Sequence, residues 1–462
     1  MAITMIRNFK YSIYGVLAFS LLSCEAYLTV EPANAVSDAN TIYDKVSAET
    51  ALRAVYRQLG DNGYYGENYV TLGYFPSGDI MNLTTGGSAN LVNVNFRTDD
   101  VAFNQAWIAI YNAINRANHV IQKVPSVIDP VLTSALKEQY VGEAKFIRAL
   151  AYSDLARAWG GVQLFLEPTI SLSDRLQIQR SSLEDTYKQV LQDLEEAEQS
   201  LPDEVNRIRA TKRTVWALRA RLHLYRKEWQ KAEEYATKLI DKANDYTLLY
   251  PYKAWFADNA VGTQESIFEL QFSATNPSAI RAQMQHPTNG GTYRYAPNNR
   301  FVELLNDPTI GGGRKDLVKS VTQGGTTIWF GNLYYRLPAT DPAYIFRIAE
   351  MYLIRAEARA QQDNLSVVDG ALFDLNKVRE RAEVPPVAAT TKSEVLLAIE
   401  EERRFEFAFE AHRWFDLART GRAKVVLEGL DPNTKVDDHE YVFPIPVTQI
   451  QLDPVLEQNP GY

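Results

Sequence analysis

Four acidic residues near the C-terminus have the spacing at which carboxylates could carry out acid–base chemistry. They are Glu402, Glu406, Glu410 and Asp416. A glycosidase needs only two carboxylates at the right separation, so sugar hydrolysis is one hypothesis. Arginines are interleaved with them at positions 403, 413 and 419. Because the two kinds of residue alternate on helical turns, the pattern favours a structural array of ion pairs over catalysis.

The five histidines form no metal-binding or catalytic pattern. They are His119, His223, His286, His412 and His439. None belongs to a His-x-x-x-His pair, and none lies at ligand spacing from the single cysteine. The chain also lacks the Gly-x-Ser-x-Gly nucleophile elbow and the Gly-x-x-x-x-Gly-Lys phosphate loop. The sequence therefore predicts no catalytic residues, no metal and no cofactor.

Aromatic residues in loop-rich stretches, mixed with amide and charged residues, could bind a sugar. A pyranose presents C–H groups on one face and hydroxyls at its rim, so a good site pairs a flat ring with polar groups. Covering about 100 Å² of sugar with one ring contributes roughly 2.5 kcal/mol. The candidates are Tyr74, Asp79, Asn82 and Arg97 in a first loop, and Tyr293, Tyr295, Trp329 and Trp255 in a middle region.

Trp329 is the first choice among these candidates. It lies between Gly324-Gly325 and Gly331, where backbone freedom allows a loop to present an indole outward. The alternative is that the ring fills space between the loop and the helices, since large aromatic side chains are highly buried on average. Four other tryptophans fall on helical patterns and are expected in the core: Trp107, Trp159, Trp216 and Trp414.

Apolar residues at helical spacing predict a mainly α fold. The predicted helices lie within residues 51–59, 107–121, 136–155, 183–197, 215–225, 232–239, 348–360, 371–382 and 395–409. Residues 60–100 lack this period, and we interpret them as a long surface loop. The interval 246–344 is also loop-rich, with a short strand at 266–272. Helix hairpins of roughly 34 residues, best seen at 213–240, are typical of tetratricopeptide repeats.

The first 24 residues have the pattern of an export signal. Arg7 and Lys10 precede an apolar run at 13–22. That run is shorter than the roughly 20 apolar residues of a membrane-spanning helix. Leu21-Leu22-Ser23-Cys24 resembles the lipobox of bacterial lipoproteins, so we expect residues 1–23 to be removed and Cys24 to be lipidated. The alternative is a secreted chain with a coincidental cysteine.

The composition narrows the partners that the protein can have. The 462 residues are 46% hydrophobic, which is ordinary for a globular chain with a large core. The formal net charge is −9 at pH 7. Nucleic-acid binding is excluded on this basis, because phosphates require a basic surface.

Several motifs along the chain resemble the SusD/RagB family of outer-membrane nutrient-binding lipoproteins. They are Trp107-x-x-x-Tyr111-x-x-Ile114-x-x-x-Asn118, Glu143 to Ala149, Trp159-Gly160-Gly161, Arg347 to Ala358, Glu402 to Phe407, Glu410 to Leu417, and Gln458 to Tyr462. Each motif is modest alone, but their order and the matching terminus make the set specific. The resemblance runs from Cys24 to Tyr462.

The resemblance implies a mainly α fold in which tetratricopeptide-like helical hairpins form a scaffold, with long loop-rich insertions and a few short strands. A SusD-like region of residues 24–242 and a RagB/SusD region of residues 243–462 would pack as one body. It further implies a lipid-anchored protein of the outer membrane that faces the cell exterior. It would capture oligosaccharides and deliver them to a SusC-like TonB-dependent transporter without catalysing a reaction.

Two alternatives stay open on the same fold. The ligand could be a peptide, or the chain could be a protein-docking scaffold, as helical repeats often are. The other alternative is a glycosidase on an all-helical scaffold.

Overall fold

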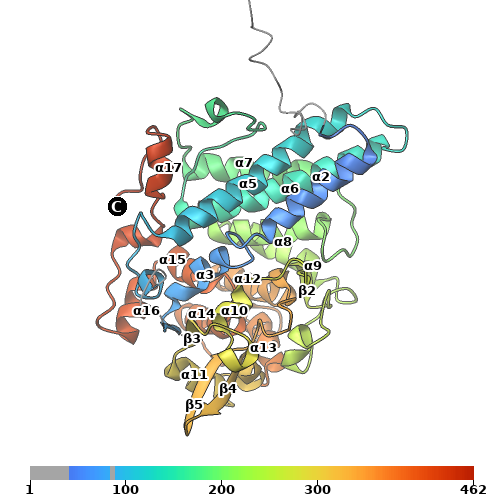
Figure 1. Ribbon diagram of the computed structural model, residues 1–462. Helices are drawn as coiled ribbons and strands as arrows, with labels where there is room; N and C mark the ends of the chain where they lie inside the picture. Colours follow the sequence, from blue (N-terminus) through green and yellow to red (C-terminus); the bar gives the residue numbers. More distant parts are fainter. Residues whose placement is uncertain (1–40, 84–88) are drawn as a thin grey trace, which may run out of the picture.

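The computed structural model describes residues 41–83 and 89–462 (Figure 1). The expected signal peptide of residues 1–23 and the expected lipidation site Cys24 lie outside the described residues. Within the described ranges, no helix combines the length and the apolar character needed to cross a bilayer.

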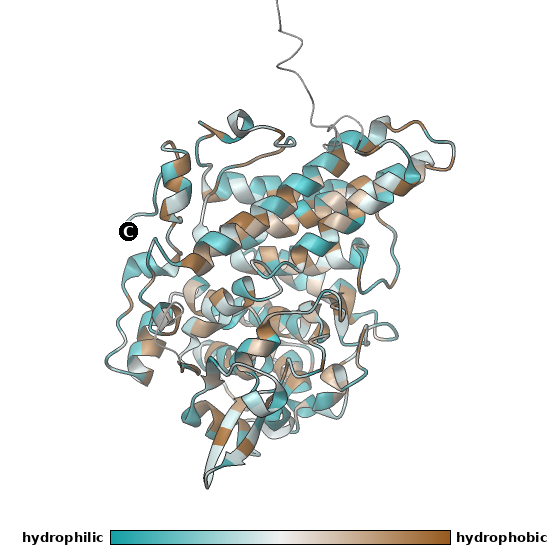
Figure 2. Cartoon of the chain, in the orientation of Figure 1, coloured by the Kyte–Doolittle hydropathy of each residue, from teal (hydrophilic) through white to brown (hydrophobic). Residues whose placement is uncertain are grey.

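Four long helices lie side by side at one end of the molecule (Figure 1). In spatial order they are α2 (Lys45–Leu59), α5 (Val101–Lys123), α6 (Ser134–Trp159) and α7 (Leu183–Ser200). Hydrophobic and hydrophilic residues alternate around the turns of the outer helices, because only one stripe faces a neighbour (Figure 2). Ser182 caps α7, since its side chain accepts a hydrogen bond from the main-chain N–H of Asp185.

A second group of helices is built as stacked hairpins. It contains α8 (Lys212–Tyr225), α9 (Trp229–Ile240), α12 (Ile348–Gln361), α13 (Ala371–Arg381) and α14 (Lys392–Glu406). α8 packs on α9, α9 on α12, and α12 on both α13 and α14. The predicted hairpin at 213–240 is confirmed as α8 and α9. Ala220, Ala232 and Ala236 are completely buried there and allow the helices to approach closely.

Short elements fill the rest of the molecule. The helices are α3 (Asn68–Tyr74), α4 (Ala89–Val92), α10 (Ile280–Met284), α11 (Asn299–Asn306), α15 (Arg413–Arg419), α16 (Ala423–Leu430) and α17 (Val447–Leu452). Three antiparallel strand pairs join β1 (Ile80–Asn82) to β3 (Tyr295–Pro297), β2 (Ser266–Leu270) to β6 (Ala343–Arg347), and β4 (Val318–Gln323) to β5 (Thr326–Gly331). The predicted fold class, mainly α with a few short strands, is confirmed.

The interpretation of residues 60–100 as a surface loop is wrong for its first part. Tyr64, Tyr65 and Tyr69 are buried against α6. The hydroxyls of Tyr64 and Tyr65 each donate a hydrogen bond of 2.6 Å to the carboxylate of Asp154. A buried acceptor on α6 therefore draws a tyrosine-rich segment into the core, although that segment lacks helical periodicity.

Candidate functional site

The hairpin of β4 and β5 carries Trp329 at the end of the molecule opposite the long helices (Figure 1). Gly324 and Gly325 form its two-residue turn with φ angles of +58° and +79°. Turns with positive φ at both positions match the twist of the strands they connect, and glycine adopts them without strain. Trp329 lies opposite Ser320 in the strand pair. Its side chain is half-buried and packs against the edge of the core.

Tyr293 lies against the same hairpin. Its hydroxyl donates a hydrogen bond of 2.9 Å to the main-chain carbonyl of Trp329. Its ring meets the ring of His286 edge to face at 5.4 Å. Burial raises the pKa of the Tyr293 hydroxyl, so this group remains a donor at neutral pH. The structure thus brings two of the predicted aromatic residues together, and each of them keeps part of its side chain exposed.

A strand pair joins the two stretches of chain that contain the sequence-predicted residues. Asn82 of β1 lies opposite Tyr295 of β3, although the two residues are far apart in the sequence. β3 also packs beside β5, so the strand pair adjoins the Trp329 hairpin. Tyr295 is only 6% exposed and its ring packs at 4.2 Å from the ring of Phe75. Tyr295 therefore supports this surface from beneath.

A pocket of about 540 Å³ lies beside β1, a size suited to a small organic ligand. Its lining combines amide, hydroxyl and charged groups with aliphatic side chains. The polar members are Asn82, Asn93, Asn298, Arg300, Asp431 and Thr434; the apolar side chains are Ile80, Met81, Val92, Val94, Leu427 and Leu430. Such a lining offers hydrogen-bond donors and acceptors around an apolar floor, which matches the hydroxyls and C–H faces of a sugar.

The sequence analysis identified only Asn82 among these polar residues. Asn298 and Arg300 follow β3 directly, and Asn298 caps α11 by accepting from the main-chain N–H of Phe301. The sequence signal that could have identified this part of the pocket is Asn298, a helix-capping asparagine three residues after the candidate Tyr295. Asp431 and Thr434 come from the segment after α16, and no local pattern connects them with residue 82.

Besides Tyr295, three more of the candidate residues are buried, so the expectation that these four are exposed is wrong. Trp255 has no exposed surface, because the guanidinium of Arg347 lies 4.1 Å from its ring centroid and neighbouring rings enclose it. Tyr74 is also fully buried, with its ring 5.3 Å from that of Phe409. Asp79 is fully buried and paired with Arg404.

Arg97 has the opposite placement. Its guanidinium is exposed and forms a two-bond ion pair with Asp99, with both bonds 2.9 Å long. It does not line the pocket beside β1.

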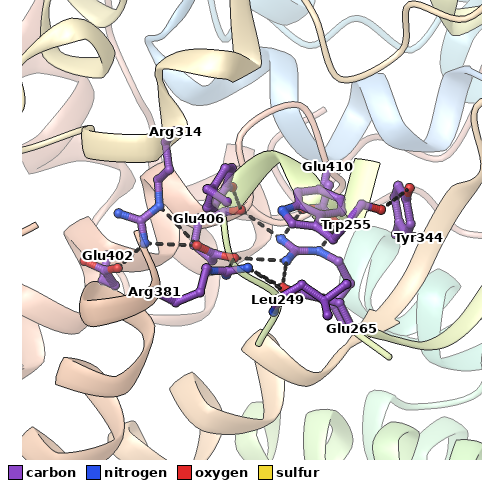
Figure 3. A network of polar contacts seen from close by, with 11 residues as sticks. Leu249, Trp255, Glu265, Arg314, Tyr344, Arg381, Glu402, Glu406 and Glu410 are labelled. Atoms are coloured by element: carbon purple, nitrogen blue, oxygen red, sulfur yellow. Dashed lines mark hydrogen bonds and ion pairs between the residues drawn. The ribbon is translucent and has the colours of Figure 1, made fainter. Parts of the chain in front are cut away.

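Three of the four clustered carboxylates, Glu402, Glu406 and Glu410, lie in one buried network of ion pairs (Figure 3). The fourth, Asp416, is paired with Arg403 and Arg419, so all four form ion pairs, as the spacing predicts. Glu406 contacts Arg314, Arg347 and Arg381, and all four side chains are at most 3% exposed. Most partners come from elements outside the sequence cluster, whereas Arg413 approaches acidic side chains only at 3.8 to 3.9 Å.

Electrostatics hold Glu406 in its charged form. Burial opposes ionisation, but the guanidinium groups of Arg381, Arg314 and Arg347 outweigh it and lower the pKa of Glu406 to about 2. Glu410 differs, because burial raises the pKa of its carboxyl even though Arg347 lies against it. Since both oxygens of Glu406 accept from guanidinium groups and the residue is fully buried, this carboxylate has no access to a substrate.

Metal-ligating residues show no clustering in the described ranges. Among residues 41–83 and 89–462, no group of three or more His, Cys, Asp or Glu side chains could hold a metal ion.

Comparison with known proteins shows that the chain is similar to SusD-like proteins. Residues 149–462 match the SusD family, and residues 26–224 match a family described as starch-binding associating with outer membrane. SusD-like protein P38 of Formosa agariphila is 28% identical, with 99% of each chain covered. Starch-binding protein SusD of Bacteroides thetaiotaomicron is 26% identical, over 72% of this chain and 74% of the relative.

The fold agrees with this similarity. The structure of surface glycan-binding protein A from Bacteroides fluxus matches with a TM-score of 0.76 at 23% identity, covering 91% of this chain and 100% of that chain. Because the SusD family match at residues 149–462 spans more than half of the sequence, this protein belongs to the SusD family.

Proposed function

We propose that this protein is a cell-surface lipoprotein that binds oligosaccharides and passes them unaltered to a TonB-dependent transporter of the outer membrane. The observation that carries the proposal is the adjacency of three features. These are the half-exposed Trp329 and Tyr293, the strand pair of Asn82 and Tyr295, and the polar pocket beside β1. Rings next to convergent amide groups suit a ligand that has both C–H faces and hydroxyls.

Membership of the SusD family supports the same ligand class. One family match is described as starch-binding, and a relative and a structural neighbour bear names that refer to starch and glycan binding. The anchor would be Cys24, and the export signal of residues 1–23 would direct the chain to the outer membrane. Delivery to a transporter rests on the family resemblance of the sequence.

A non-catalytic role is supported by the state of the carboxylates. Hydrolysis of a glycosidic bond needs one carboxylic acid and one carboxylate within reach of the sugar. Glu402 and Glu406 are fully buried and saturated by arginines, and Glu410 is 3% exposed and bound to Arg347.

The proposal is tested by isothermal titration of the purified protein with neutral oligosaccharides of plant, host and microbial origin. We expect binding to at least one of them, without release of shorter products during long incubation. Trp329→Ala should weaken that binding about tenfold or more, which corresponds to about 1.4 kcal/mol. Thr327→Ala is the matched control, because Thr327 is an exposed residue of the same strand.

Four results would count against the proposal or a part of it. A folded protein that binds no member of the panel would reject glycan binding, and peptides that co-purify and compete would indicate a peptide ligand. Product release that is lost in Glu406→Gln or Glu410→Gln would establish a glycosidase instead. Equal affinities of Trp329→Ala and Thr327→Ala would remove Trp329 from the site.

A further inference from the structure

A second cavity, of about 400 Å³, lies among the stacked hairpins and shares no lining residue with the pocket beside β1. Its walls come from the turn between α8 and α9, from α12 and α14, and from α15 with the residues after it (Figure 1). We propose that this cavity is a second carbohydrate subsite, which takes a short oligosaccharide carrying a carboxylate. The inference deepens the proposed function, since it presumes a carbohydrate ligand.

The cavity has an aromatic and aliphatic wall that the packing of the core leaves partly uncovered. Trp229 begins α9 and is half-buried, and Tyr225 ends α8 in the same state. Across the cavity, α14 contributes Leu396 and Leu397, and Leu397 is 43% exposed. A partly exposed indole facing aliphatic side chains can cover the C–H face of a pyranose, as a ring does in carbohydrate recognition.

The charged side chains of the lining are paired with one another, with one exception. Arg403 and Arg419 both bind Asp416, Arg419 also binds Glu357, and Arg422 binds Glu400. Lys227 completes the charged lining, and no ion pair links it to a carboxylate among the described residues. Counting four cations and three carboxylates gives the lining a net charge of +1.

Lys227 is held in a backbone conformation that a lysine rarely adopts. Its φ angle is +58°, at the position after α8 where a helix most often ends in glycine. The N–H of Glu228 bonds to the carbonyl of His223, and the N–H of Lys227 bonds to the carbonyl of Leu224, which is the hydrogen-bond pattern of a Schellman ending. This turn places at the rim of the cavity an exposed lysine that forms no ion pair within the described part of the chain.

The polar groups between the apolar wall and Lys227 suit the hydroxyls of a sugar better than the groups of a peptide. Both oxygens of Glu357 accept from Arg419 and Glu400 is bound to Arg422, so the polar groups open to a ligand are Lys227 and Ser393, which is exposed at the rim and can both donate and accept. A sugar hydroxyl donates and accepts at one atom, so it can satisfy such a mixed rim. The Lys227 ammonium would pair with the carboxylate of a hexuronate.

The test uses trigalacturonic acid and its methyl ester as probes in isothermal titration with the purified protein. The ester keeps the rings and linkages but lacks the charge. We expect the acid to bind more tightly than the ester, with an affinity that falls as salt is added. Trp229→Ala should weaken the binding of both probes about tenfold. Gln230→Ala, at the exposed neighbouring position that does not line the cavity, should leave both unchanged.

Lys227→Gly is the sharper variant, because glycine relieves the strained φ angle and so should fold at least as well. It should weaken binding of the acid several-fold and leave binding of the ester unchanged. Ser393→Trp, which fills the cavity from an exposed position, should abolish both. Trp329→Ala should affect neither, which separates this site from the first one.

The proposal is overturned by any of three outcomes. They are no binding of trigalacturonic acid by the folded protein, equal affinity of the acid for wild type and Lys227→Gly, and loss of its binding in Trp329→Ala but not in Trp229→Ala. Displacement of the acid by an acidic peptide at lower concentration would assign the cavity to peptides instead. If the protein bound none of the neutral oligosaccharides, the proposed function would be contradicted. The variants of this cavity would then decide separately whether trigalacturonic acid binds here.

Discussion

The guanidinium of Arg404 binds the carboxylate of Asp79, and its Nε donates to Oδ2 of Asp79 at 3.0 Å. Asp79 is fully buried and Arg404 is 6% exposed. The pair joins the segment before β1 to α14, which lies 325 residues further along the chain. It also anchors the wall of the pocket beside β1, because Gly78 and Ile80 line that pocket on either side of Asp79.

Removal of the arginine should destabilise the protein strongly. Arg404→Met leaves the buried carboxylate of Asp79 with only the partly exposed Arg300, 3.9 Å away, as a cationic neighbour. The loss of the buried partner of such a pair costs about 3–5 kcal/mol of unfolding free energy. Urea unfolding followed by circular dichroism measures the change. The double variant Asp79→Leu with Arg404→Met should recover most of the loss, since no buried charge remains. A single variant that loses less than about 1 kcal/mol would show that Asp79 is solvated, as in an exposed pair.

Acid should weaken the network around Glu406. Because the folded-state pKa of Glu406 is about 2 and its ordinary value is 4.5, this group stabilises the fold fully above about pH 4.5. That stabilisation is lost as the pH falls toward 2. The difference in unfolding free energy between wild type and Glu406→Gln should therefore shrink as the pH falls through this range.

Glu410→Gln is the control for this pH dependence. Burial raises the pKa of Glu410. The difference in unfolding free energy between wild type and Glu410→Gln should therefore not shrink as the pH falls, unlike that of Glu406→Gln. Denaturant unfolding at a series of pH values measures the difference in unfolding free energy for both variants. A Glu406→Gln difference that is constant from neutral to acid pH would contradict the prediction.

Tyr293→Phe should loosen the hairpin without unfolding the protein. The change removes the hydroxyl that donates to the carbonyl of Trp329, which is worth about 1 kcal/mol. Amide hydrogen exchange in β4 and β5 should become faster, while exchange in α6 stays unchanged. Tyr43→Phe is the control, since Tyr43 is 65% exposed. Identical exchange in the two variants would argue that the hydrogen bond contributes nothing to the hairpin.

The turn of the hairpin depends on glycine for its backbone angles alone. A Cβ atom at Gly324 or Gly325 would meet nothing within 4 Å, so any cost of Ala comes from the positive φ. We expect about 1–2 kcal/mol of destabilisation for each substitution. Gly429→Ala has equally free space but lies in α16 without a positive φ, and should stabilise the fold by about 0.5–1 kcal/mol. Thermal unfolding distinguishes the expected loss of stability in the turn variants from the expected gain in Gly429→Ala.

Helices were predictable from the sequence wherever apolar residues repeat on one face. α2, α5, α7 and α9 follow that period closely, with their buried residues on one face, and their neighbours on the scaffold are other helices. α3 escaped prediction because its segment relies on tyrosines whose hydroxyls need Asp154, a residue on another helix. Neither helical period nor composition reports such a long-range acceptor.

The exposure of the candidate binding residues was harder to predict for a related reason. Trp255 and Trp329 both lie in loop-rich sequence, and Trp255 is the buried one because Arg347 and the rings of Phe256 and Tyr344 enclose it. The partner of Arg404 is one of 57 acidic residues, and no local spacing singles out Asp79. Which residues pair across distant segments depends on how the whole chain packs, and a local sequence pattern does not show this.

If the proposed site holds, the pairing of Asn82 with Tyr295 ties ligand preference to two stretches of chain that are translated far apart in time. A ribosome-bound fragment that ends before residue 295 has only half of this surface, so under that proposal the nascent protein would not bind its ligand while it is still being made. Relatives that adapt to a new polysaccharide would have to alter both stretches in concert, and grafting either one alone into another scaffold would transfer no specificity.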